Sequence, residues 1–537
     1  MARPVPVTAV EGALERRRWL TIPLVLLAGV AMVIGLVVIL WGAALAAVYF
    51  GGERTPYFAS DSEHFKYGSI GAERDSGIPH LAWQALPRLF PEMFGTAEQQ
   101  AAARLRGQGA YNAFGFLYEP ASTGKPEPRD LPIGISRRTV RGVEMVWFNC
   151  AVCHTGTARE ADGTKPLVVA GMPSNNLDFH RFISFVTSIA DDPRLEADRL
   201  IDAIETGGER LGVTDRLLWR HVIGPRLREG LLARRAQLGP LIGMQPAWGP
   251  GRVDTFNPYK VVQLAQRAGD PPPEQWIGAS DFPSVFHQRP RDGMQLHWDG
   301  NNASLEERNL SAAVGAGLVL EHASTADRDA IRRSSNWLLD LAPPPSPMRA
   351  GIDGSAVERG RALYMTQCAG CHGYQGTSGY VFDGAELGRV VPLGRIGTDR
   401  SRLDSYTDAF RRMQREVLGF SHFIKTDGYA NQPLDALWLR GPYLHNGSVP
   451  TLAALLRPVH ERPRYFLRGS DIIDRERGGF RSETFDTAEA CEAAARRTRG
   501  HFCFDTRQAG NGNGGHEFGT SLDEARRDEL LTYLRTF

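Results

Sequence analysis

The sequence has little cysteine, almost no net charge and no long internal repeat. Lysine and arginine total 62 against 61 aspartate and glutamate residues, so the formal net charge is +1. A chain without excess positive charge gives no sign of a nucleic-acid-binding surface. We find no low-complexity tract. The hydrophobic content of 42% and the charged content of 23% are typical of an ordinary globular protein.

Four of the six cysteines belong to one pattern that occurs twice. Cys-x-x-Cys-His is formed by Cys150, Cys153 and His154, and again by Cys368, Cys371 and His372. A redox dithiol would leave the histidine without a role, and a zinc site would need a second ligand pair nearby, which neither pattern has. Covalent haem uses all three residues: the thiols form thioethers and the imidazole binds iron. Chance would produce even one such pattern about two times in a thousand, so we predict two haem c groups.

One long apolar run lies near the N-terminus. No charged residue occurs from Trp19 to Gly52, which exceeds the ~20 apolar residues that span a bilayer. Haem c is attached outside the bacterial cytoplasm, so the chain must cross a membrane. The three arginines at positions 16–18 place the N-terminus in the cytoplasm. We therefore expect a cytoplasmic tail over residues 1–18, a single transmembrane helix over 19–50 in the bacterial inner membrane, and periplasmic haem domains.

A cleaved signal peptide is the alternative to this anchor. Signal peptides usually have an apolar region of about 7–15 residues, and the run here is about twice as long. The sequence Ala44–Ala46 still has the composition of a cleavage site. In a retained anchor, Trp41 and Tyr49 are expected near the outer membrane interface.

The two patterns are too far apart for one small cytochrome fold. They are separated by 218 positions (368 − 150). Leu341–Gly351 contains four prolines in five residues, which cannot continue a helix and favour an extended connector. We expect a mainly α protein with long loops, an enlarged N-terminal haem c domain over residues 51–345 and a C-terminal haem c domain over 346–537.

Local patterns predict helices around both haem sites. Ser304 with Glu307, and Ser521 with Glu524, have the spacing of a capping box at a helix start. The second pair opens the apolar-patterned C-terminal segment that closes a small cytochrome c domain. A further helix is expected from Ser355 up to the second haem pattern.

The two remaining cysteines, Cys491 and Cys503, lie twelve positions apart in the sequence. Haem c implies an oxidising compartment, where such a pair forms a disulfide closing a small loop. Two buried free thiols are the alternative.

After the second haem pattern, "LWLRGPYLHNGSVPTLAALL" resembles the bacterial di-haem cytochrome c peroxidase superfamily. Members typically carry an Arg, then Pro-Tyr-x-His-x-Gly-Ser, then Thr-Leu; here these are Arg440, Pro442, Tyr443, His445, Gly447, Ser448, Thr451 and Leu452. "MQLHWDGNN", "IGTDRSRLDSYTDAF", "IKTDGYANQPLDALWLRGPYLHNGS" and "GHEFGTSL" are similar to its branch of di-haem rubber-oxygenase-like proteins. The resemblance spans roughly residues 100–537 and implies haem-dependent oxidoreductase chemistry.

The second haem has a candidate for its sixth ligand. His516 lies in the glycine-rich "GNGNGGHEFG", where the backbone can approach a porphyrin closely, and the rubber-oxygenase-like branch places its second histidine there. We predict the metal ligand pair His372 and His516. His460 is an alternative, and Met413 is a weaker one because it falls in a predicted helix. His445 is expected to pack or to hydrogen-bond near the haem.

The first haem has His154 as its predicted metal ligand and no obvious second one; His180, Met172 and His221 are weak candidates. The aromatic segment "FPSVFHQRPRDGMQLHWDGNN" contributes residues that either line a distal pocket or bridge the haems. A peroxidase needs a distal acid–base group, for which His287 and His297 are candidates. An oxygenase of the related branch has an apolar distal side instead. The candidate catalytic residues are therefore Phe286, His287, His297, Trp298 and Arg440; a packed aromatic loop is the alternative.

Three function classes follow. In an enzyme, the N-terminal haem binds peroxide or O2 and the C-terminal haem, held by two histidines, transfers electrons. In a pure electron carrier, both haems have two strong protein ligands. A sensor would need a signalling domain, and none is visible in the short cytoplasmic tail. The size of the N-terminal domain favours the enzyme.

The expected partners are a small-molecule oxidant, either peroxide or O2, and a periplasmic or membrane electron-transfer partner. Because the chain is tethered to a membrane, polyisoprene is not an expected substrate even if the chemistry is related. A calcium ion between the domains is left open by the sequence.

We predict that the mature protein carries two covalently attached haems. Each pattern supplies two thioether bonds, so both haems should survive acid–acetone extraction. Intact mass spectrometry measures their number directly. A mass that corresponds to one haem, or to none, would contradict this assignment.

Overall fold

The computed structural model describes residues 24–43, 52–95, 98, 100, 109–119, 129–265 and 272–537. Near the N-terminus, the helix Leu24–Ala43 is 20 residues long, has a mean hydropathy of 2.9, and is long and apolar enough to cross a membrane. Helices of this kind serve as signal anchors or as single membrane spans. The predicted tail over residues 1–18, the sequence Ala44–Ala46 and Tyr49 lie outside the described residues.

The chain divides into two units. One comprises the N-terminal segment up to Arg54 together with Thr139–Glu144, and the other comprises Thr55–Arg138 and Met145–Phe537. Both haem patterns belong to the second unit. This unit is undivided at residues 345–346, so the pair of separate haem domains stays a prediction.

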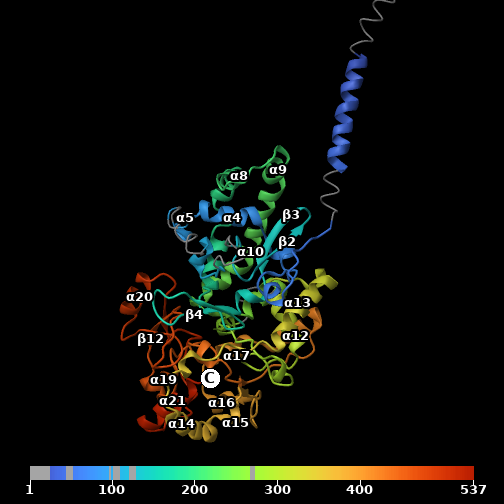
Figure 1. Ribbon diagram of the computed structural model, residues 1–537. Helices are drawn as coiled ribbons and strands as arrows, with labels where there is room; N and C mark the ends of the chain where they lie inside the picture. The colour runs from blue at the N-terminus through green and yellow to red at the C-terminus, as the bar shows by residue number, and fades with distance from the viewer. Residues whose placement is uncertain are drawn as a thin grey trace, which may run out of the picture. The chain divides into compact units, whose positions relative to one another are not determined.

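Helices dominate the second unit, which confirms the expectation of a mainly α protein. Its first half contains α2 (Asp61–Tyr67), α3 (Glu73–Ser76), α4 (His80–Leu89), α5 (Pro91–Phe94), α7 (Phe179–Ser188), α8 (Ala197–Thr206), α9 (Val213–Leu218), α10 (Gly224–Met244), α11 (Asn257–Gln263), α12 (Leu305–Gly315) and α13 (Thr325–Leu339). Its second half contains α14 (Gly354–Gln367), α15 (Ala369–His372), α16 (Leu393–Ile396), α17 (Ser401–Ser405), α18 (Asp408–Leu418), α19 (Leu452–Leu455), α20 (Ala488–Arg497) and α21 (Glu524–Leu534). In Figure 1, α4 and α8–α10 lie at one end of this unit, and α14, α15 and α21 lie at the other.

The strands are short and form small antiparallel sheets. Three-stranded sheets have the orders β1-β3-β2 and β13-β12-β14, and the pairs are β4-β5, β6-β7, β8-β9 and β10-β11. The strands are β1 (Ile78–Pro79), β2 (Ile135–Val140), β3 (Val143–Phe148), β4 (Thr155–Ala158), β5 (Leu167–Ala170), β6 (Arg252–Asp254), β7 (Ala279–Asp281), β8 (Tyr374–Gln375), β9 (Tyr380–Val381), β10 (Val390–Pro392), β11 (Gly428–Ala430), β12 (Tyr465–Arg468), β13 (Thr484–Phe485) and β14 (Phe502–Asp505). Long loops connect them, and these loops carry most of the candidate site residues.

Buried aromatic side chains form the main core of each half. In the first half, the Trp83 and Tyr111 rings stack with centroids 3.7 Å apart and pack with several phenylalanines. In the second half, Tyr364 on α14 packs edge-on against Tyr533 on α21, with centroids 5.2 Å apart. Full burial of one large apolar side chain stabilises the fold by roughly 1.5–3 kcal/mol, so these clusters hold the helices that frame the two haem patterns.

A third core cluster joins the two halves. It contains Met172 and Phe286 from the first half, and Met348, Trp438 and Phe480 from the second. Phe286 and Trp438 are almost completely buried. This shared core explains why the second unit is undivided where two domains were expected.

Neither of the two predicted capping boxes is present in full. Ser304 caps α12 by accepting the Glu307 N–H at 3.2 Å, but the Glu307 carboxylate accepts backbone N–H groups of residues 421–422 instead of completing the box. The prediction that Ser521 starts the last helix was wrong. The Asp523 side chain caps α21 by accepting the Arg526 N–H at 3.0 Å, since an aspartate at this position also interacts favourably with the helix dipole.

The predicted disulfide is present. It joins Cys491 on α20 to Cys503 on β14, with their Cα atoms 5.5 Å apart. β14 leads directly into the glycine-rich segment that ends at His516. The disulfide therefore fixes the strand from which this segment departs.

His180 gives a test of the fold through pH. It lies on α7, and its ring packs edge-on against Trp248 with centroids 5.0 Å apart. Burial lowers the pKa of His180 to about 4, whereas an unfolded histidine titrates near 6.5. Below pH 6.5 the unfolded state takes up a proton that folded His180 does not, so stability should fall as the pH falls from 6.5 towards 4, by at most about 1.4 kcal/mol per pH unit for this group.

The variant His180→Phe keeps an aromatic ring against Trp248 and removes the titration. We expect its melting temperature to depend less on pH between 6.5 and 4.5 than that of the wild-type protein, as measured by circular dichroism. Parallel curves for the two proteins would contradict this assignment.

Candidate functional site

The first haem pattern lies on a short 3-10 turn after β3. The turn begins at Asn149, whose side-chain oxygen accepts the Ala151 N–H at 3.0 Å and whose side-chain NH2 donates to the Gly68 carbonyl at 3.0 Å. His154 Nδ1 donates to the Pro283 carbonyl oxygen at 3.0 Å. Its Nε2 is thereby left as the acceptor nitrogen, as a haem ligand requires. Cys150 and Cys153 are half-buried and belong to no disulfide.

The second haem pattern forms α15 and has the same arrangement. His372 Nδ1 donates to the Gln432 carbonyl oxygen at 2.8 Å, so its Nε2 is also the acceptor. The Tyr380 hydroxyl makes two hydrogen bonds in this region. It donates to the His372 carbonyl and accepts from the Leu434 N–H at 2.7 Å. Cys368 and Cys371 of this pattern are likewise in no disulfide.

His516 faces His372. Their ring centroids are 6.1 Å apart. An imidazole nitrogen binds a transition metal at about 2 Å, so two imidazoles on opposite sides of one metal have centres about 6 Å apart. The backbone N–H of His516 donates to the Ile396 carbonyl at 2.7 Å. The buried ring nitrogen Nδ1 of His516 has no hydrogen-bond partner among the described residues. The spacing fits a haem iron held between the two rings.

The other candidate ligands for the second haem lie elsewhere. The His460 side chain is 81% exposed and lies beside Glu461. Met413 lies on α18, where it packs against an aromatic core cluster. His445 is buried and stacks on the Tyr429 ring, with centroids 4.0 Å apart, and burial lowers its pKa well below the usual value.

The histidine candidates for a second ligand of the first haem make no ring contact with His154. Among the described residues, no ring contact pairs a second imidazole with His154, whereas His180 packs on Trp248. Met172 is buried in the shared core, and His221 is exposed. The two predicted haem sites therefore differ in their surroundings.

Trp298 connects the segment beneath His154 to the second site. The Pro283 carbonyl accepts from His154, and two residues earlier the Asp281 carbonyl accepts the Trp298 indole N–H at 2.8 Å. The neighbouring His297 carbonyl accepts from the side-chain NH2 of Gln432 at 2.9 Å. Because the Gln432 carbonyl accepts from His372, one chain of covalent and hydrogen bonds joins the two proximal histidines.

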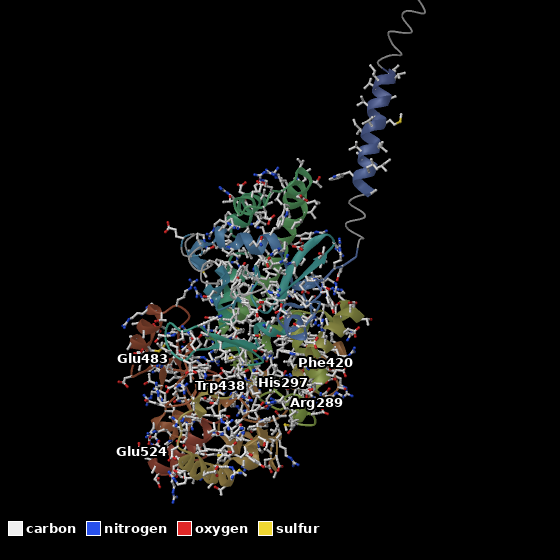
Figure 2. All side chains as sticks on the ribbon, in the orientation of Figure 1. Arg289, His297, Phe420, Trp438, Glu483 and Glu524 are labelled. Atoms are coloured by element: carbon white, nitrogen blue, oxygen red, sulfur yellow. A yellow bond between two sulfur atoms is a disulfide. The ribbon has the colours of Figure 1, made fainter. Side chains whose placement is uncertain are left out.

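His297 itself has a strained backbone and a fixed ring. Its φ of +66° lies in the left-handed region, which costs a non-glycine residue of order 1–3 kcal/mol. Its Nδ1 donates to the Asn301 side-chain oxygen at 2.6 Å, and burial lowers its pKa to about 4. At neutral pH the ring is therefore uncharged, with Nε2 as a proton acceptor. Figure 2 labels His297, which is half-buried in the second unit.

Two other candidates, His287 and Arg440, meet at a buried carboxylate. Asp435 accepts from His287 Nδ1 at 3.0 Å, from Arg291 at 2.5 Å and from Arg440 at 2.7 Å. Burial alone would raise the pKa of Asp435, but the two guanidinium groups hold it well below its usual value. The fifth candidate, Phe286, is buried in the shared core, and its carbonyl accepts from Arg291 at 3.1 Å.

Sequence reasoning missed two residues that matter because of where they lie in the fold. The Gln432 carbonyl, which orients His372, carries no signal in the residue type. Arg308 on α12 is the second case. Burial raises the pKa of Cys150 and lowers that of His154, and the positive charge of Arg308 acts on both groups, which places it near the first haem pattern. Its guanidinium bonds to the Asn309 side chain at 2.9 Å, and no carboxylate of the described residues pairs with it. Arg308 is therefore suited to hold a haem propionate.

Calcium has no ready-made site in the described part of the chain. No group of three or more His, Cys, Asp or Glu side chains is arranged there to hold a metal ion. Backbone carbonyls are also calcium ligands, so calcium stays a prediction.

Comparison with known proteins supports the cytochrome assignment. The profile of a family described as RoxA-like, cytochrome c-like matches residues 428–467. This match supports the rubber-oxygenase-like cytochrome branch, while membership of the wider di-haem peroxidase superfamily stays a prediction.

Two relatives from Sinorhizobium fredii are uncharacterised proteins. The chain is 25% identical to y4iJ over 507 residues, covering 76% of this chain and 80% of the relative. It is 28% identical to y4iM over 289 residues, covering 48% of this chain and 64% of the relative. Neither name assigns a substrate or an activity.

We predict that the variant Asp435→Ala is strongly destabilised. It leaves Arg291 and Arg440 buried without their carboxylate, and breaking a buried ion pair costs about 3–5 kcal/mol. Denaturant unfolding measures the loss. The matched control is Asp340→Ala, which breaks the exposed pair with Arg289 (labelled in Figure 2) and should cost far less, because exposed ion pairs contribute little to stability. Equal losses in the two variants would contradict a structural role for the buried cluster.

Proposed function

We propose that the chain is a membrane-anchored, periplasmic di-haem c-type cytochrome with oxidoreductase activity of the peroxidase or oxygenase type. The difference between the two sites carries this proposal. His372 faces His516 at a spacing that suits an iron with two imidazole ligands, while among the ring contacts of the described residues His154 has no such partner. A pure electron carrier would be expected to have two closed sites.

The chemistry that haem c supplies when bound is one-electron transfer and, where an axial position is open, binding of O2 or peroxide. The chain's own residues supply orientation. The hydrogen bonds of His154 and His372 to backbone carbonyls hold each ring with Nε2 free. Cys150, Cys153, Cys368 and Cys371 provide the covalent attachment.

Proton transfer is assigned to histidines of the segment between the two sites. A neutral His297 with its Nδ1 engaged can accept a proton at Nε2. His287 bonds through Nδ1 to the Asp435 carboxylate, which orients its ring as a second candidate for proton transfer. Two histidines suit a peroxidase, which needs an acid–base group. An oxygenase of the related branch would need an apolar residue such as Phe286 beside its haem, and Phe286 lies in the shared core instead.

Coupling between the sites is assigned to Trp298 and Gln432. Their side-chain hydrogen bonds, to the Asp281 and His297 carbonyls, link the two loops that support His154 and His372. This link contains no flexible charged side chain, so it holds the two proximal rings in a constant relation.

The N-terminal helix supports the proposed location. As a retained anchor, Leu24–Ala43 would tether the haem domains to the periplasmic face of the inner membrane, with the N-terminus in the cytoplasm. We propose a small-molecule oxidant and a periplasmic or membrane electron-transfer partner as the reactants.

Replacing the axial candidates distinguishes an enzyme from a carrier. We expect electron paramagnetic resonance of the oxidised wild-type protein to show one low-spin haem with two imidazoles and one haem that is five-coordinate or weakly ligated. His516→Ala should convert the low-spin signal to high-spin, because alanine cannot bind iron. His154→Ala should abolish peroxide or O2 binding and leave that low-spin signal in place.

The wild-type protein itself provides the opposing outcome. Two low-spin haems that fail to react with peroxide, with cyanide, or with carbon monoxide after reduction would establish the electron-carrier alternative.

A further inference from the structure

The segment that delivers His516 cannot fix its own conformation. Residues 510–516 read Gly-Asn-Gly-Asn-Gly-Gly-His and belong to no helix or strand. Gly510 and Gly515 have φ values of +80° and +72°, and His516 itself has a φ of +50°. Glycine is flexible in such conformations, and the histidine is strained in its own. Contacts from outside the segment must therefore set the direction of the His516 ring.

Asn446 and Ser448 hold the first part of this segment. The Asn446 side-chain NH2 donates to the carbonyls of Gly510 at 3.2 Å and Gly512 at 3.0 Å, and the Ser448 hydroxyl donates to Gly512 at 2.9 Å. None of these bonds reaches residues 513–516.

Arg462 holds the second part. Its Nη1 donates to the carbonyls of Asn513 at 2.7 Å and Gly515 at 2.8 Å, and its Nη2 donates to that of His516 at 3.4 Å. The other side of the guanidinium donates to the end of α19, with Nη2 bonding to the Leu455 carbonyl and Nε to the Arg457 carbonyl, each at 3.2 Å. All the nitrogen atoms of the group thus bond to backbone carbonyls.

This use of a buried arginine is specific to its shape. Arg462 is 4% exposed, and each of its hydrogen-bond acceptors is a backbone carbonyl, not a carboxylate. A planar fork of five N–H groups can span two chain segments at once, whereas a lysine ammonium donates from a single point. The geometry suits a clamp between α19 and the histidine-bearing segment better than an ion pair.

We infer that Arg462 is a positioning residue of the second haem site, which keeps His516 directed at His372. The inference rests on the proposed ligation by this histidine pair. Without the clamp, residues 513–516 should move more freely and the His516 ring should leave its position opposite His372 more often. An external ligand would then compete for that position.

The experiment uses the full-length protein carrying both haems, in the variants Arg462→Gln, Arg462→Lys and His516→Ala. The matched control is Arg457→Gln, because the Arg457 side chain is 44% exposed and lies beside Glu461, and only its backbone carbonyl bonds to Arg462. Spin state, carbon monoxide binding after reduction and hydrogen exchange of residues 513–516 are measured.

We expect Arg462→Gln to lose part of the low-spin signal and to gain a high-spin signal that added imidazole reverses. Carbon monoxide should bind the reduced second haem about tenfold faster or more, since three hydrogen bonds to the ligand segment are lost. Exchange of residues 513–516 should accelerate. Arg462→Lys should give a smaller loss of the same kind, and Arg457→Gln should match the wild-type protein.

Unchanged spin state and unchanged exchange in both Arg462 variants would overturn the inference. If Arg462→Gln fails to assemble with two haems, Arg462→Lys decides by the same readouts, with imidazole reversal separating displacement of His516 from general unfolding. An unaltered spectrum in His516→Ala would instead overturn the proposed ligation itself, so the two failures are distinguishable.

Discussion

The arrangement of both candidate sites depends on two hydrogen bonds, each from an imidazole Nδ1 to a backbone carbonyl. His154 donates to Pro283 and His372 donates to Gln432, across 129 and 60 positions of sequence. An imidazole can present Nε2 to a metal in a fixed direction only when its other nitrogen is engaged. The long loops that begin after β7 and β11 therefore have a structural purpose: they bring these carbonyls beneath the two haem patterns.

The 428–467 segment, where the cytochrome family profile matches, contains none of the proposed iron ligands. It contains their supports instead. Gln432 accepts from the proximal His372, while Asn446, Ser448 and Arg462 hold the segment that ends at His516. Both faces of the proposed second haem site are thus organised by one stretch of about forty residues. It is reasonable that the family profile matches this stretch, because a shift of the stretch would displace the His372 and His516 rings together.

Sequence reasoning reached features encoded by residue type and spacing: the two Cys-x-x-Cys-His patterns, the helix that precedes the second pattern, and the disulfide. It could not reach features encoded by backbone position. A carbonyl such as that of Gln432 is present in every residue, and the Asp435 cluster gathers side chains from segments about 145 positions apart. The shared core around Phe286 and Trp438 is equally non-local, and no sequence pattern signals it.

Backbone strain is concentrated where these supports meet. His287, His297, Ala436, Leu444 and His516 have positive φ values, each costing of order 1–3 kcal/mol. Each lies within the loops that carry the candidate site or its supports. Such conformations persist only when surrounding contacts over-determine them, and here the contacts are buried: the Asp435 cluster beside His287, the Asn301 amide beside His297 and the Arg462 fork beside His516. The polar network therefore stabilises the loop conformations that hold the histidines in position. This explains why buried charged groups lie around sites whose proposed chemistry is carried out by imidazole rings.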